Sequence, residues 1–283
     1  MDQIFFKLIL MKRFWSGKKK RRQQLDDHVR QKKVACFGYR SVAEDQKAHW
    51  VRSHFNTVAN DYDLMNTILS FGIHHLWKRK ALKMLALKPD DRVLDLCGGT
   101  GDLAVRATRH LASPQQIILY DINPDMIRAG LAKGSAAQTR KQIAYIIGDA
   151  ERMALAGQRF DAVMVGFGMR NLTHMIKGFA EIYRVLRPGG KMICLEFSKP
   201  TTPWFRWLYD FYSFYIMPIV GKLVVGSRKA YTYLPESIRL FSLPHELKII
   251  LEEIGFTKVI YQKLTNGIAV VHYAEKPQHS LKE

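Results

Sequence analysis

The chain has 283 residues, 47% of them apolar, and its 44 Lys and Arg against 25 Asp and Glu give a formal charge of +19. This composition excludes disordered, collagen-like and mucin-like chains, and the length permits a core that needs no metal or disulfide staple. Three cysteines, an odd number scattered along the chain, fit neither a disulfide framework nor a zinc site. They favour a reducing compartment.

The amino-terminal segment is strongly basic, because residues 1–33 hold eleven Lys and Arg against three acids. We expect residues 1–35 to form an extension without fixed structure. It is a solvated terminus, the product of a start codon assigned too early, or a contact with anionic lipid or nucleic acid. The apolar runs 4–11 and 207–220 each contain a charge and are too short to span a membrane, and the first lacks the charge order of a secretory signal.

Residues 36–275 are expected to form a single domain of the α/β class, with a short tail over 276–283. From residue 92 onward, short apolar strands alternate with helices, which predicts a doubly wound, mostly parallel sheet with helices on both faces. A turn at Asn266 and Gly267 predicts a closing antiparallel hairpin. The five parallel strands are expected to begin at Arg92, Gln116, Ile143, Phe160 and Lys191, and the helices to cover 102–111, 124–133 and 175–186.

Two segments fall outside this alternation. Residues 36–90 are expected to form a helical lid, with two or three helices over 44–87, and residues 200–245 form an insertion rich in aromatic side chains. We expect both to cover the edge at which the parallel strands end, because ligands of open α/β sheets bind there.

The run from Asp95 to Asp102 follows the first strand and opens a helix. Glycines such as Gly98 and Gly101 let the backbone turn tightly and approach a ligand closely. The run also fits a loose dinucleotide fingerprint, but the carboxylate of Asp95 would repel a pyrophosphate and would suit an ammonium group. This favours S-adenosyl-L-methionine (SAM), which carries an ammonium and a sulfonium but no phosphate.

Acidic residues follow the next two strands as well. Asp121 closes the second strand, where a carboxylate can accept both hydroxyls of a ribose, and Asp149 follows the third, where it can meet an adenine amino group. Either aspartate alone could equally cap a helix. Together with Asp95 they are difficult to assign to structure alone.

Six longer runs stand out, which begin at Phe37, Val58, Leu69, Leu94, Gly168 and Leu195. Through these runs the chain resembles the UbiE family of bacterial ubiquinone/menaquinone biosynthesis C-methyltransferases over about residues 36–273. The resemblance implies SAM as the cofactor, with contacts at Thr100, Asp121, Asp149 and Ala150. A further contact is expected at Gly166, where family members often have a serine hydroxyl that this chain lacks.

The resemblance also implies the reaction, which is C-methylation of a polyprenylated quinol ring. Both 2-methoxy-6-polyprenyl-1,4-benzoquinol and demethylmenaquinol remain open as acceptors. The implied location is the bacterial cytoplasm at the inner face of the cytoplasmic membrane, with the membrane surface and a quinone-biosynthesis complex as partners.

Methyl transfer to an aromatic carbon requires in-line approach, an electron-rich ring and a group that takes the ring proton, but no metal. Arg170 and Asn171 follow the fourth strand, where a guanidinium would favour a phenolate and the amide could orient an oxygen or a water. Tyr62 is the third candidate. The alternatives are a helix cap for the Arg-Asn pair and a packing role for Tyr62. His74 and His75 could act as bases, but in a helix beside Leu76 and Trp77 capping or packing roles are favoured.

The aromatic run over 204–215 suits a polyprenyl tail or a membrane surface, with Arg206, Lys222, Arg228 and Lys229 nearby. Packing in the domain core is the alternative. A nucleic-acid methyltransferase is disfavoured, because the fourth strand lacks the Asn/Asp-Pro-Pro-aromatic run used on extruded bases. A non-catalytic lipid-binding module with the same fold is the remaining rival.

Overall fold

The computed structural model describes residues 15, 21, 25–134, 136–225 and 230–278. Its centre is a seven-stranded sheet of order β5-β4-β3-β6-β7-β9-β8, parallel from β5 to β7 and antiparallel on both sides of β9. This confirms the predicted sheet and its closing hairpin. The strands are β3 (Val93–Leu96), β4 (Ile117–Asp121), β5 (Ala144–Ile147), β6 (Phe160–Gly166), β7 (Leu186–Phe197), β8 (Thr257–Leu264) and β9 (Ala269–Glu275).

Helices cover both faces of the sheet and bury two apolar clusters against it. In α10 (Met175–Val185), Phe179, Ile182 and Val185 recur on one face and are fully buried, each contributing about 1.5–3 kcal/mol of stability. The other helices that pack around the sheet are α6 (His74–Leu85), α7 (Asp102–Ala107), α8 (Pro124–Leu131), α9 (Ala137–Gln142) and α14 (Pro244–Ile254).

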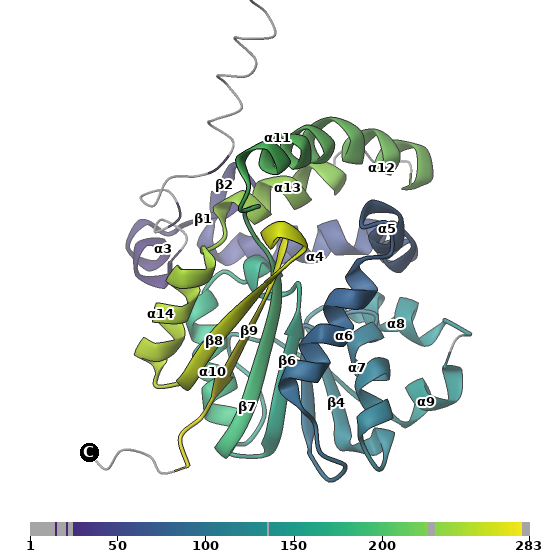
Figure 1. The fold of residues 1–283 in the computed structure, drawn as a ribbon, viewed down its shortest axis with the longest axis vertical. Helices are drawn as coiled ribbons and strands as arrows, with labels where there is room; N and C mark the ends of the chain where they lie inside the picture. The colour runs from purple at the N-terminus through teal and green to yellow at the C-terminus, as the bar shows by residue number, and fades with distance from the viewer. Residues whose placement is uncertain (1–14, 16–20, 22–24, 135, 226–229, 279–283) are drawn as a thin grey trace, which may run out of the picture.

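A second group of helices lies across the end of the sheet where the parallel strands finish (Figure 1). The lid supplies α4 (Lys47–Val58) and α5 (Tyr62–Leu69), which with α6 confirm the helices expected over 44–87. The insertion supplies α11 (Pro203–Phe211), the π-helical turn η5 (Tyr212–Ile216), α12 (Met217–Val225) and α13 (Ala230–Leu240).

The prediction that residues 1–35 have no fixed structure is wrong for residues 26–35. Helix α3 (Asp26–Lys32) is followed by a hairpin of β1 (Val34–Phe37) and β2 (Arg40–Ala43), which the sequence did not indicate. The buried Asp26 carboxylate accepts the backbone N–H groups of Ile176 and Lys177 at 3.1 and 3.0 Å. It thereby caps α10 from a distant part of the chain.

Two further residues of the extension contact the domain, while residues 1–14, 16–20 and 22–24 lie outside the described part. The Trp15 indole N–H donates to both carboxylate oxygens of Asp210 on α11 at 3.1 Å. Arg21 forms an ion pair of 2.7 Å with Glu246 on α14. The extension is therefore attached to the insertion side of the molecule.

Candidate active site

The loop from Gly98 to Gly101 joins β3 to α7 and presses against the neighbouring strand. Gly99 and Gly101 have φ of +56° and +75°, which only glycine adopts readily. A Cβ on Gly98 would lie 2.6 Å from Leu119 Cγ, so the loop can approach β4 only without a side chain there. Gly101 is the N-cap of α7, and its left-handed backbone allows the chain to turn from the loop into this helix.

Asp95 points from β3 into the space above this loop and is 1% exposed. Its Oδ2 accepts the Ala104 N–H at 3.1 Å, whereas no group of the described chain donates to its Oδ1. Burial raises the pKa of Asp95 to about 8, despite the attraction of Lys78 and this hydrogen bond. A buried oxygen without a donor is unfavourable, so the site is complementary to a donor from a ligand.

Asp121 ends β4 beside Asp95, and both of its oxygens are held by backbone groups. Oδ2 accepts the Gly99 N–H at 2.8 Å and Oδ1 accepts the Asn123 N–H at 2.7 Å. Burial outweighs these bonds and raises the pKa of Asp121 to about 6. Each carboxylate oxygen keeps a lone pair that can accept a hydroxyl.

A cavity of about 1070 Å³, here called the rim cavity, opens above these aspartates. Asp149 also lines it and is exposed, with its Oδ1 accepting the Glu151 N–H at 2.9 Å. Of the predicted cofactor residues only Gly101 does not line the cavity. Those that do are Asp95, Gly98, Thr100, Asp121, Asp149, Ala150 and Gly166, joined by the predicted catalytic residues Tyr62 and Asn171.

The rim cavity fits SAM. The ammonium of SAM would supply the donor that Asp95 Oδ1 lacks, and its ribose hydroxyls match the remaining lone pairs of Asp121. When bound, SAM supplies an electrophilic methyl group on a sulfonium.

The lid closes one side of the rim cavity through α5. The Thr100 hydroxyl donates to Asp63 at 2.9 Å from Oδ1 and 3.0 Å from Oδ2, and Lys133 forms an ion pair with the same carboxylate. On α4, Asn56 Oδ1 accepts the Asn123 amide at 2.8 Å. These contacts join the lid to the loops after β3 and β4.

A second cavity of about 520 Å³, the junction cavity, adjoins the rim cavity between the lid and the insertion. It shares Phe55, Tyr62 and Phe167 with the rim cavity. Arg170, which does not line the rim cavity, lines this one. The predicted catalytic residues are thus brought to the boundary of the two cavities.

Arg170 is buried and paired with a carboxylate. Its Nη1 lies 3.0 Å from Glu196 Oε2 and donates to the Phe167 carbonyl, while its Nε has no partner in the described chain. Burial opposes the charged form, but Glu196, Tyr62 and Tyr233 together outweigh it and raise the pKa of Arg170. The guanidinium therefore acts on a ligand mainly as a hydrogen-bond donor, because its net charge is balanced.

Asn171 is oriented by a residue of the insertion. The Tyr233 hydroxyl donates to Asn171 Oδ1 at 2.9 Å, and Tyr233 stacks on Phe37 with ring centroids 4.2 Å apart. Both Tyr233 and His54 line the junction cavity. These residues and Glu196 were not predicted as site residues, although Glu196 lies in one of the family-like runs.

A third cavity, the apolar cavity of about 1280 Å³, lies between the lid and the insertion and shares Phe167 and Phe197 with the junction cavity. Its walls are almost entirely apolar. They include Leu69, Phe71, Trp77, Phe205, Leu208, Phe211, Tyr212, Ile216, Met217 and Leu234.

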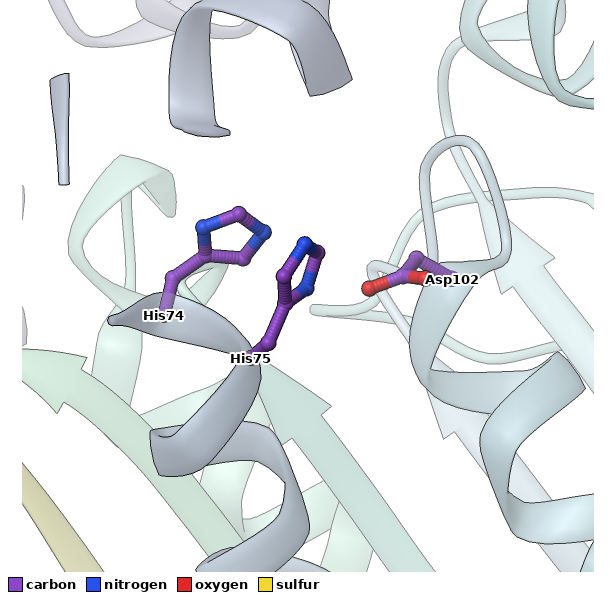
Figure 2. A group of neighbouring side chains, drawn as sticks. All are labelled: His74, His75 and Asp102. Carbon is purple, nitrogen blue, oxygen red and sulfur yellow. The ribbon is translucent and has the colours of Figure 1, made fainter. Parts of the chain in front are cut away.

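Figure 2 shows the rings of His74 and His75 on one turn of α6, with Asp102 facing them from α7. Lys78 and Arg106 lie 2.8 and 3.1 Å from Asp102 Oδ2. Burial opposes ionisation of Asp102, yet these cations hold its pKa below the ordinary value. They would also repel a metal ion, so the chemistry of this group does not fit a metal site.

Comparison with known proteins agrees with the geometry. The family model described as the ubiE/COQ5 methyltransferase family matches residues 40–276. The ubiquinone/menaquinone biosynthesis C-methyltransferase UbiE of Pseudomonas putida is 41% identical over 255 residues, 90% of this chain and 99% of that protein. The UbiE of Hydrogenovibrio crunogenus is 41% identical over 246 residues, 87% and 97% of the two chains.

The fold is similar to that of a solved SAM-dependent methyltransferase of Thermotoga maritima. The TM-score is 0.56 at 19% identity, with 79% of this chain and 99% of the other covered. The family match spans the lid, the sheet and the insertion. The chain belongs to the ubiE/COQ5 methyltransferase family.

Proposed function

We propose that this chain transfers a methyl group from SAM to a ring carbon of a polyprenylated quinol in ubiquinone or menaquinone biosynthesis. The observation that carries the proposal is the row of three cavities. The acidic rim cavity suits SAM, the junction cavity is lined by hydrogen-bonding groups suited to a quinol ring, and the apolar cavity suits a prenyl tail.

The chain's own groups would act on the quinol hydroxyl. The unpartnered Nε–H of Arg170 and the Asn171 amide can donate to a hydroxyl oxygen and favour its ionised form. Tyr62 borders both the rim and the junction cavity and can close over the ring. Phe55 and Phe167 exclude water from the same space.

The test is methyl transfer by the purified chain from SAM to short-chain demethylmenaquinol and to the benzoquinol, each in detergent. Mass spectrometry should find a C-methylated product with at least one acceptor. Calorimetric binding of SAM without transfer to either acceptor would contradict the proposal. A chain that does not bind SAM would instead favour the lipid-binding module.

The membrane surface is a second part of the proposal. On α11 and η5, Trp207, Phe211 and Tyr215 stack at 6.2 and 5.3 Å along the outer face. Leu223 on α12 is 78% exposed, and Phe71 at the mouth of the apolar cavity is 79% exposed. Exposed aromatic and aliphatic groups of this kind suit a membrane–water interface.

Charge supports an anionic surface as the partner. Arg206 lies on α11 and Lys222 on α12, the helices that carry the exposed apolar groups, while Arg228 and Lys229 lie outside the described residues. None of the described helices is long and apolar enough to span a bilayer. A chain carrying Trp207→Ser and Phe211→Ser should lose most co-sedimentation with anionic vesicles, and unchanged co-sedimentation would contradict this surface.

A further inference from the structure

Phe167 lies at the point where the three cavities meet. Of the residues that the structure describes, it alone lines the rim cavity, the junction cavity and the apolar cavity. It is 7% exposed and follows the end of β6. Phe167 therefore lies where the space that suits SAM meets the space that suits the acceptor.

The backbone of Phe167 is in a conformation that a bulky residue rarely adopts. Its φ is +61°, in the left-handed region, between Gly166 and Gly168. A phenylalanine in this region is an outlier, and such strain persists only where the surroundings enforce it. A glycine at position 167 would adopt this backbone conformation without strain. The presence of phenylalanine therefore indicates that its side chain has a function there.

Three hydrogen bonds enforce this conformation. The Phe167 N–H donates to the Leu195 carbonyl at 2.7 Å. The Phe167 carbonyl accepts Arg170 Nη1 and, at 3.4 Å, the Asn171 amide. Glu196 holds Arg170 in place for this contact.

The ring is fixed by neighbours from two other elements. It stacks on Phe197 of β7 with centroids 4.4 Å apart and an angle of 28°. The Trp77 ring of α6 meets it edge-on at 6.3 Å. The orientation of the ring is thus set by packing as well as by its backbone.

We infer that Phe167 is a positioning residue for the acceptor: its ring is the flat wall on which the quinol ring packs, and it decides which acceptor atom meets the methyl group. This inference rests on the proposed function. In the correct alignment the ring carbon supplies the electron pair for the new bond, the methyl–sulfur bond breaks with its pair left on sulfur, and the ring proton passes to water.

A misaligned quinol presents a different nucleophile. A slip of the ring by the two-bond distance between that carbon and the hydroxyl oxygen on the neighbouring carbon brings the oxygen to the position of the carbon. The oxygen would then take the methyl and lose its own proton to water, giving a methyl ether. The ratio of C-methylated to O-methylated product therefore reports alignment directly, and a purely structural role would not change it.

The experiment compares Phe167→Leu with Phe179→Leu. Phe179 is a fully buried residue of α10 that lines none of the three cavities, so it controls for the loss of a packed aromatic ring. For Phe167→Leu we expect turnover to fall roughly tenfold to a hundredfold, as small misplacements do. We also expect O-methylated product, with SAM affinity by calorimetry within about threefold of wild type, since the rim contacts remain.

Phe179→Leu should lose stability but give only C-methylated product. A folded Phe167→Leu that keeps wild-type turnover and forms only C-methylated product would overturn the inference. If circular dichroism shows that Phe167→Leu is unfolded, Phe167→Met is measured in its place with the same two outcomes. A wild-type chain that methylates neither quinol would overturn the proposed function instead.

Discussion

The rim cavity and the junction cavity differ in what holds their functional groups. At the rim, the carboxylates of Asp95 and Asp121 accept backbone N–H groups, from helix α7 for Asp95 and from neighbouring loops for Asp121. In the junction cavity, Arg170 is held by the Glu196 side chain, and at the boundary with the rim cavity Asn171 is held by the Tyr233 side chain. A substitution at the rim therefore removes one ligand contact, whereas a substitution at the junction also removes a support for its neighbours.

The largest effect is expected at the junction. Arg170→Ala should lower turnover by more than a hundredfold, because one desolvated donor to a transition state contributes about 3 kcal/mol. SAM affinity should stay within a few fold, since Arg170 does not line the rim cavity. Steady-state kinetics with the quinol and calorimetry with SAM provide the two measurements.

A double variant separates the loss of the catalytic guanidinium from the destabilising effect of an unpaired buried charge. Arg170→Ala alone leaves the buried Glu196 carboxylate without its cationic partner, which is destabilising. Arg170→Met combined with Glu196→Gln removes both charges, and thermal unfolding should show that this variant is folded. Its turnover should nevertheless be as low as that of Arg170→Ala. Recovery of wild-type turnover in the double variant would show that the guanidinium is not required.

At the rim, Asp95→Asn should weaken SAM binding by roughly tenfold to a hundredfold, the equivalent of about 1.5–3 kcal/mol for a hydrogen bond to a charged group. The same rim contact predicts a pH dependence. Burial raises the pKa of Asp95 to about 8, so its carboxyl is largely protonated at pH 7 in the free protein. An ammonium ligand favours the carboxylate, so SAM binding should release a proton and strengthen as the pH rises to about 8.

The contribution of Asp95 to folding stability depends on pH in the opposite direction to SAM binding. A folded pKa above the unfolded value means that the stability from this group is present at about pH 4 and is lost as the pH rises through about 8. Calorimetry at pH 7 in two buffers of different ionisation enthalpy counts the released proton. Asp95→Asn is the control, and equal proton release from this variant would assign the proton to another group.

Asp63 joins the lid to Thr100 at the rim, so its loss tests how far SAM binding depends on the lid. Asp63→Asn should weaken SAM binding by about fivefold and raise the KM for the quinol, because the lid loses its bonds to Thr100 and Lys133. Asp90→Asn removes the same charge from an exposed loop at the other end of β3. If both variants weakened SAM binding equally, the cause would be the change in net charge and not the loss of the lid contacts.

The smallest effect is expected from the extension. Trp15→Ala removes the indole contact with Asp210 and the ring that lies 4.9 Å from the Arg239 guanidinium. The loss should lower the melting temperature by about 2–4 °C, as expected for about 1 kcal/mol in a domain of this size. The KM for the quinol should rise a few fold at unchanged SAM affinity, and a change confined to SAM affinity would contradict the attachment to the insertion.

The sequence was informative wherever neighbours along the chain determine the structure. Short apolar runs predicted the sheet, and the glycines after β3 and the aspartates at the strand ends predicted the rim cavity. Helix α3 and the β1–β2 hairpin were missed, because α3 is held by the contact of Asp26 with the start of α10, 150 residues away. Local patterns carry no signal for such a contact.

Only some residues of the junction cavity and its surroundings were predicted, because the others are brought there by contacts between distant parts of the chain. The Arg-Asn run identified Arg170 and Asn171, but their supports come from β7 and α13. The left-handed conformation of Phe167 also has no local signature, since phenylalanine is a poor choice for such a turn. The contacts of its carbonyl with Arg170 and Asn171 stabilise this conformation, and both depend on the folded structure.

The π-helical turn η5 between α11 and α12 limits how the insertion can change in length. Before it, Asp210 faces inward to Arg239, and after it the buried Met217 lines the apolar cavity. Removing one residue from 212–216 would rotate the following helix by about 100°. Met217 would then turn toward solvent, so evolution can exchange residues in this turn more easily than it can delete one.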